Sequence, residues 1–156
     1  MTPSLPDEST LSKASWSATL IGVEALRRGG WTPQIAWRWD VAMHADDDAA
    51  VPAGFLVVRR PLAWFHDVLP GLVRPRADND LFCLRPVWAL ADLLAHGRNR
   101  DHGPAWFGGL TPDDVQPMPA SDAERADWRA ACAAFGLDAA REARWLAEGG
   151  STAELI

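Results

Sequence analysis

The spacing of apolar residues in the first part of the chain predicts one helix followed by two strands. Between Ser15 and the glycine pair at 29–30, apolar residues recur every three or four positions, which gathers them on one face of a helix that the glycines end. Residues 36–43 (AWRWDVAM) alternate between apolar and polar side chains, as a half-buried strand does. Residues 55–60 (FLVVRR) form a short apolar run that ends in two arginines, which indicates a more deeply buried strand.

Two prolines mark the next elements. Pro61 favours the first turn of a short helix through residues 62–68 (LAWFHDV). Pro86 closes a strand at 81–84, because proline cannot donate to a sheet. The same proline is suited to begin a helix, and the apolar stripe along residues 87–94 predicts one.

The C-terminal third is predicted to be helical. Ser121 and Glu124 form a capping box that opens a helix to about Phe135. A helix start is also predicted at 111–114 (TPDD), and a last helix at 138–147.

This order of elements predicts the α+β class, with a small mixed sheet of three or four strands packed with helices and a helical C-terminal third. Residues 1–12 are rich in proline, serine and acids and are expected to be flexible, as is the tail at 149–156. Residues 13–148 are expected to form a single domain, since 156 residues are enough for one ordinary core.

Composition narrows the class of protein. Nearly half of the residues are apolar and nine are Trp, which argues against disorder of the whole chain. The net charge of −6 argues against a broad surface for nucleic acid. Cys83 and Cys132 lie in apolar stretches without metal-ligand spacing, so buried free thiols in a reducing cytoplasm are expected. No apolar run approaches the roughly 18 residues of a membrane span, and the first residues do not form a secretory signal.

Histidines and acids could form a metal or catalytic site, but their patterns are weak. His44 precedes three consecutive acids at 46–48, which do not converge on one ion unless the loop wraps tightly, so a solvated turn is the better interpretation. The pair His66-Asp67 and His102 could offer a general base, but no nucleophile with a known signature accompanies them. We therefore expect no metal, no cofactor and no catalytic residue.

An enzyme remains the rival interpretation. Asp40 on one predicted strand and Asp80 before another are placed as the acids of divalent-metal nucleases are, although the companion acid-x-Lys pattern is absent. A nuclease-like or hydrolytic enzyme would draw on Asp40, His44, Asp80 or His66. If these side chains converge in a pocket, the enzyme gains support, and if they scatter it loses it.

Tryptophans and arginines are the candidate contact residues. Trp37 and Trp39 share one face of a predicted strand and are expected in the core, although stacking on bases is an alternative use of such residues. Trp88 falls off the main apolar stripe of its helix and is expected to be partly exposed. Because Trp and Arg dominate interface hot spots, five residues are predicted to bind a partner protein. They are Arg59, Arg60, Arg85, Trp88 and Trp106.

Asp92 is the one acid inside the predicted helix at 87–94. A carboxylate half-covered by neighbouring elements needs a compensating partner. Arg59, Arg60 and Arg85 leave the ends of candidate strands that the helix would pack on. The prediction is a structural ion pair between Asp92 and one of these arginines, with no chemical role for the acid.

Three segments resemble a known family in their order along the chain. They are SATLIGVEALRRGGWTPQIAWRWDVAM, AGFLVVRRPLAWF and LRPVWALADLLAH. Together they resemble the C-terminal domain of AbiEi-like antitoxins, which belong to type IV toxin–antitoxin pairs of bacteria. Its final helix has the form P-x-x-A-L-x-D-L-L, which here falls on Pro86, Ala89, Leu90, Asp92, Leu93 and Leu94. The resemblance covers roughly residues 15–97.

The resemblance implies a regulatory module that acts by binding. Members of that family usually join a winged-helix domain, which binds operator DNA for transcriptional regulation, to a domain that counteracts a nucleotidyltransferase-like toxin. Only about a dozen residues precede the resembling region here, so a winged helix does not fit and DNA binding is not expected. The resemblance thus implies a cytoplasmic bacterial protein that binds a partner protein, for which a nucleotidyltransferase-like toxin is the candidate. A subunit that associates with a separate DNA-binding chain is a further alternative.

Overall fold

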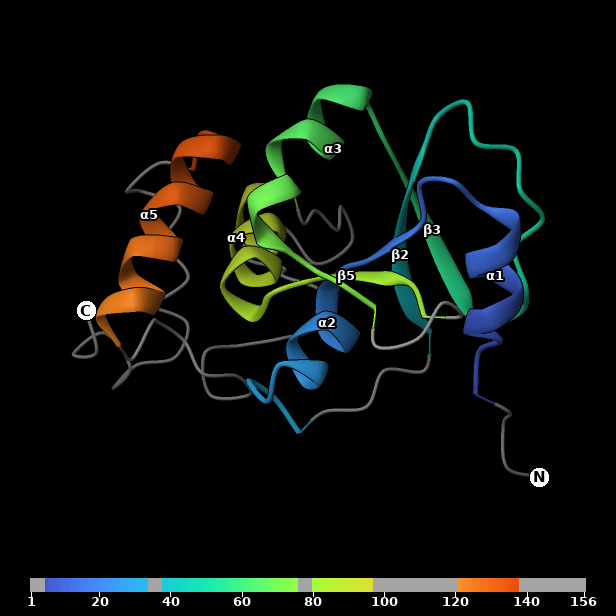
Figure 1. Cartoon of the computed structure of the whole chain (residues 1–156), viewed down its shortest axis with the longest axis horizontal. Helices are drawn as coiled ribbons and strands as arrows, with labels where there is room; N and C mark the ends of the chain where they lie inside the picture. The colour runs from blue at the N-terminus through green and yellow to red at the C-terminus, as the bar shows by residue number, and fades with distance from the viewer. Residues whose placement is uncertain (1–4, 34–37, 76–79, 97–120, 138–156) are drawn as a thin grey trace, which may run out of the picture.

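The computed structural model describes residues 5–33, 38–75, 80–96 and 121–137. These residues form a five-stranded mixed sheet with helices packed around it (Figure 1). The predicted α+β class is confirmed, although the sheet has five strands and not three or four. Trp37, His102, Trp106 and the helices predicted at 111–114 and 138–147 lie outside the described residues.

The strand order in the sheet is β3-β2-β1-β5-β4. The pairs β2/β3 and β1/β5 are parallel, whereas β1/β2 and β4/β5 are antiparallel. The two parallel pairs meet where β2 lies antiparallel to β1, so the sheet is mixed. The strands are β1 (Thr19–Leu20), β2 (Trp39–His44), β3 (Phe55–Arg60), β4 (Leu72–Val73) and β5 (Phe82–Leu84).

Five α-helices and a short 3₁₀ helix accompany the sheet in the described part of the chain. The helix α4 lies between α2 and α5, and α5 forms the end of the molecule opposite α1 in Figure 1. The helices are α1 (Glu8–Ala14), α2 (Gly22–Arg28), α3 (Leu62–Asp67), η1 (Leu69–Gly71), α4 (Pro86–His96) and α5 (Asp122–Phe135).

The two strands that were not predicted, β1 and β4, are the shortest, and neither shows a periodic pattern in the sequence. β1 interrupts the stretch from Ser15 that was predicted to be one helix, so only α2 in that stretch is helical. β4 lies between the short helix predicted after Pro61 and the strand predicted at 81–84, where no strand was predicted. Two residues of strand leave no measurable alternation, and pairing with β5 decides their structure.

The N-terminal segment differs from its prediction. Residues 1–12 were expected to be flexible, yet α1 begins at Glu8, and the Asp7 carboxylate accepts a hydrogen bond from the Thr10 amide at 3.1 Å as the helix cap. Leu11 on this helix is fully buried in the core. One buried leucine in a polar segment is a weak sequence signal, and its burial depends on the sheet that the helix crosses.

The helix α1 crosses one face of the sheet. Pro6, just before the helix, lies against Gly54 at the start of β3. Farther along, the Ser12 hydroxyl donates to the carbonyl of Asp80, which precedes β5 (3.2 Å). Along the sheet, Leu20, Val41 and Val57 stand in register, so they share one face. Asp40 and Arg60 point to the other face, where Arg60 reaches Asp92 of α4.

The helix α4 is buried around its whole circumference, from Val87 to Leu94. A helix in that position packs on several elements at once, and its bulkiest side chain, Trp88, lies directly over Gly71. A Cβ atom on Gly71 would come 2.3 Å from Cγ of the Trp88 indole. Trp88 is 1% exposed, so the ring has no free space into which it can move.

Gly71→Ala should therefore lower the free energy of unfolding by about 1–3 kcal/mol, because the methyl group overpacks a closed contact. Urea unfolding followed by tryptophan fluorescence measures this. Gly30→Asn is the control, since a Cβ there meets no atom within 4 Å and asparagine tolerates the positive φ of that residue. Equal stability of the Gly71→Ala variant and the parent would contradict the close approach.

Candidate functional site

Asp92 is the most buried polar centre that the sequence had singled out. The residue is 1% exposed, and its Oδ1 accepts a hydrogen bond from the indole Nε1 of Trp64 at 2.8 Å. Nη2 of Arg60 lies 3.5 Å from Oδ2, and Nε2 of His96, one turn along α4, lies 3.9 Å from Oδ1. Of the three candidate arginines, Arg60 is the one beside this carboxylate. The indole, which the sequence had not indicated, makes the shorter contact.

Burial raises the pKa of Asp92, and the charge of Arg60 and the hydrogen bond from Trp64 act in the opposite direction. Arg60 also stacks on the Trp64 ring, with its guanidinium carbon 5.7 Å from the ring centroid. These contacts join α4 to β3 and α3. They shield the Asp92 carboxylate from solvent, so neither of its oxygens is open to a substrate. The role of this carboxylate is therefore structural.

Asp40 brings a second carboxylate to the same interior. It points from β2 to the face that α4 covers, and its Oδ2 packs on Gly22, where a Cβ would come within 2.7 Å. Burial, followed by repulsion from Asp92, raises the pKa of Asp40 to about 6. The sequence placed Asp40 and Asp92 on separate elements and gave no sign that they are neighbours.

Arg85 and Trp88 both donate hydrogen bonds to the same acid of α5, Asp127. The Arg85 guanidinium forms a two-point ion pair with Asp127, with contacts of 2.7 and 3.1 Å, and the Trp88 indole donates to the same carboxylate at 2.7 Å. The prediction that Trp88 is partly exposed is wrong, because α5 and Gly71 cover it. Its contribution is to the core, where its ring also meets Phe135 edge-on.

Arg59 and Asp47 organise the turn after β2. Asp47 was interpreted as part of a solvated turn, which is wrong for this residue: its carboxylate is buried and accepts hydrogen bonds from the hydroxyls of Ser15 and Ser17. Burial opposes ionisation, but these bonds outweigh it and lower the pKa of Asp47. Arg59 donates to the carbonyls of Asp47 and His44, so its guanidinium is held by its own turn.

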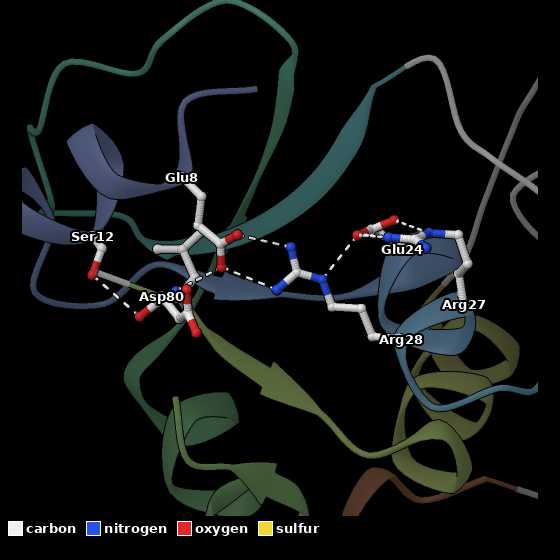
Figure 2. Close-up of polar contacts among 7 residues, drawn as sticks. Glu8, Ser12, Glu24, Arg27, Arg28 and Asp80 are labelled. Atoms are coloured by element: carbon white, nitrogen blue, oxygen red, sulfur yellow. Dashed lines mark hydrogen bonds and ion pairs between the residues drawn. The ribbon is translucent and has the colours of Figure 1, made fainter. Parts of the chain in front are cut away.

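A third charged network ties α2 to α1 (Figure 2). The Arg28 guanidinium bridges Glu8 of α1 and the buried Glu24 of α2, at 2.8 Å from each, and Glu24 also pairs with Arg27. Glu8 in turn accepts a hydrogen bond from the amide of Leu81 at 2.8 Å. The network borders a hollow of about 430 Å³, but both of its arginines already have carboxylate partners.

A second hollow, of about 730 Å³, has an apolar rim that the sequence did not reveal. Trp16 is 65% exposed there, Leu69 is 60% exposed, and Phe82 is also exposed. We call these three residues the Trp16 face. Trp16 had been predicted on the apolar side of a helix, but residues 15–18 form a turn held by Asp47, and the turn directs the indole outward.

The side chains of the rival enzyme hypothesis do not gather in one pocket of the described structure. Asp80 lines both hollows, whereas Asp40, His44 and His66 line neither. His44 packs against the rings of Trp16 and Phe65, and His66 is exposed on α3. Within the part of the chain that the structure describes, no three His, Cys, Asp or Glu residues are placed to hold a metal ion.

Cys83 is a buried thiol, as expected, whereas Cys132 is only partly buried, so the prediction of burial is wrong for Cys132. Burial raises the pKa of Cys83 to about 12, so its thiolate is not populated near neutral pH. None of the described helices is both long enough and apolar enough to cross a membrane.

The comparisons with known proteins give no match, whether with family models, with curated protein sequences or with solved structures. The resemblance of residues 15–97 to AbiEi-like antitoxins therefore stays a prediction.

Asp92→Ala should lower the free energy of unfolding by about 3 kcal/mol, since it leaves the Trp64 indole and a largely buried guanidinium without their acceptor. Asp92→Asn should cost less, because its amide oxygen still accepts from Trp64. Chemical unfolding measures both, with Asp122→Asn on an exposed helix start as the control. If Asp92→Ala were as stable as the parent, the carboxylate would not hold α4 in place.

Asp40 should make the protein less stable as pH rises. Its folded pKa of about 6 exceeds the unfolded value near 3.8, so the folded state binds the extra proton and stability falls between about pH 4 and pH 6. Asp40→Asn should remove this fall and raise the free energy of unfolding at pH 7 by roughly 1–3 kcal/mol.

Unfolding curves at several pH values test this, with the exposed Asp46→Asn as the matched control. A variant whose stability has the same pH dependence as the parent would show that Asp40 is not the group responsible.

Proposed function

We propose that this protein is a non-enzymatic, antitoxin-like binding protein that antagonises a nucleotidyltransferase-like toxin through the Trp16 face. The proposed binding through this face rests on the exposure of Trp16 and Leu69 beside a hollow of about 730 Å³. Exposed apolar side chains grouped around a depression are typical of a protein-binding surface. The resemblance to AbiEi-like antitoxins supports the kind of partner.

The interior contacts are consistent with a binding role. In the resembling P-x-x-A-L-x-D-L-L segment, Asp92 is enclosed and contacts Trp64 and Arg60. The segment is therefore suited to act as a scaffold. The buried carboxylates Asp47 and Glu24 are likewise occupied by hydrogen bonds within the chain. A scaffold of this kind holds the surface residues in fixed positions, which lowers the entropy cost of binding.

The Trp16 face replaces most of the contact residues that the sequence had suggested. Arg59 and Arg60 are held by internal acceptors, and Arg85 is paired with Asp127 while its side chain stays 40% exposed. Trp16 has the properties of a hot-spot anchor: a large indole, exposed in the free protein, on a turn fixed by the buried Asp47.

The test is co-expression with nucleotidyltransferase-like proteins encoded beside this gene, scored by rescue of growth and by co-purification. Trp16→Ser should weaken binding at least tenfold, since truncating a central Trp typically costs about 2 kcal/mol or more. Trp16→Phe should keep most of the binding. Leu5→Ser changes an exposed leucine that does not line the hollow, so it should bind as the parent does.

A folded Trp16→Ser variant that rescues growth fully would show that the toxin contacts another surface. Failure of the parent protein to bind or neutralise any such toxin would overturn the proposed function itself. Circular dichroism and unfolding curves establish that each variant is folded.

A further inference from the structure

Among the residues that the structure describes, the strand β3 leaves one of its two edges unpaired. It is the terminal strand in the order β3-β2-β1-β5-β4, and it pairs with β2 alone. The opposite terminal strand, β4, has two residues, whereas β3 has six. Every residue of β3 keeps some exposed surface, and Leu56 is 47% exposed. An edge of this length is a template for pairing with another strand.

The pairing with β2 shows which residues of β3 direct their backbone N–H and C=O groups away from β2. The amide of Trp39 donates to the carbonyl of Gly54 at 2.9 Å, so Gly54 directs its backbone toward β2. Because backbone direction alternates along a strand, Leu56 and the other even-numbered residues also face β2. Phe55, Val57 and Arg59 therefore face outward, and their backbone groups make no hydrogen bond with any described residue.

The edge lacks the usual protection against pairing. Residues 55–60 (FLVVRR) contain no proline, glycine, lysine or acid. The two arginines stand at one end of the strand, and both guanidiniums are drawn to their own chain: Arg59 to two carbonyls of the turn after β2, and Arg60 to Asp92. The stretch from Phe55 to Val58 is thus apolar and has no charged side chain of its own.

We propose that β3 pairs with β3 of a second copy of this chain, antiparallel about a twofold axis at Val57, to form one continuous sheet. In this register the outward residue Val57 faces its own copy, and Phe55 faces Arg59 of the second chain. Three pairs of outward residues then face one another, and each pair exchanges two backbone hydrogen bonds, which gives about six new bonds.

The positions of the charges favour antiparallel pairing of β3 with a second copy of the chain. Antiparallel pairing puts the arginine pairs of the two chains at opposite ends, whereas parallel pairing would set Arg59 beside Arg59 and repel. The antiparallel register also places the exposed Leu56 opposite Val58 of the second chain, so apolar side chains cover one another. The interface is self-complementary, as a twofold dimer requires.

The first experiment measures mass against concentration by light scattering or sedimentation. The apparent mass of the parent protein should rise from that of one chain, 17.0 kDa, toward that of two chains as concentration increases. Val57→Pro should shift it to the monomer, because proline removes an outward amide that β2 does not use. Val57→Thr keeps the amide and should still dimerise. A parent that stays monomeric, or a dimer unaffected by proline, overturns the proposal.

The second experiment covers the case in which the proline variant does not fold. Val57→Cys places two thiols at the twofold axis, so mild oxidation should yield a covalent dimer. Val58→Cys is the matched control, since residue 58 faces residue 56 of the second chain and its thiols are kept apart. The parent, with Cys83 and Cys132, sets the background. Equal crosslinking of the two variants overturns the proposal, and a monomer that binds another extended chain would assign the edge to that chain. Neither result bears on the Trp16 face.

Discussion

The structure depends on the complete burial of α4 between the sheet, α2 and α5. All side chains from Val87 to Leu94 are buried, and so the polar Asp92 must find its partners inside the protein. Trp64 and Arg60 provide them and thereby attach α3 and the end of β3 to the same helix. One carboxylate thus fixes the relative positions of three elements. It also raises the pKa of Asp40, so the constraint has an electrostatic cost.

Charged side chains in this fold mainly join its elements. Arg28 and Glu8 join α2 to α1, Arg85 and Asp127 join α4 to α5, and Asp47 fixes the turn after β2. These contacts are partly or fully shielded from water. Shielded ion pairs with hydrogen bonds fix the geometry of a fold more effectively than exposed ion pairs do.

The described part of the chain presents two exposed apolar surfaces, and they differ in kind. The Trp16 face presents side chains around a hollow, which suits a shaped partner such as a folded protein. The edge of β3 presents backbone groups along a straight strand, which suits another strand. Because the two lie on different elements, a dimer through β3 and a partner on the Trp16 face are compatible with each other.

The sequence by itself determined the long elements: β3 at 55–60, the helix after Pro86 and the capped helix from Ser121. Their periodicity and caps are local, and so they are readable in one dimension. Only the tertiary structure decided the two-residue strands, the proximity of Asp40 to Asp92, the burial of Trp88 and the exposure of Trp16. Each of these depends on residues tens of positions apart, because burial and pKa are set by what packs against a side chain and not by its neighbours in the chain.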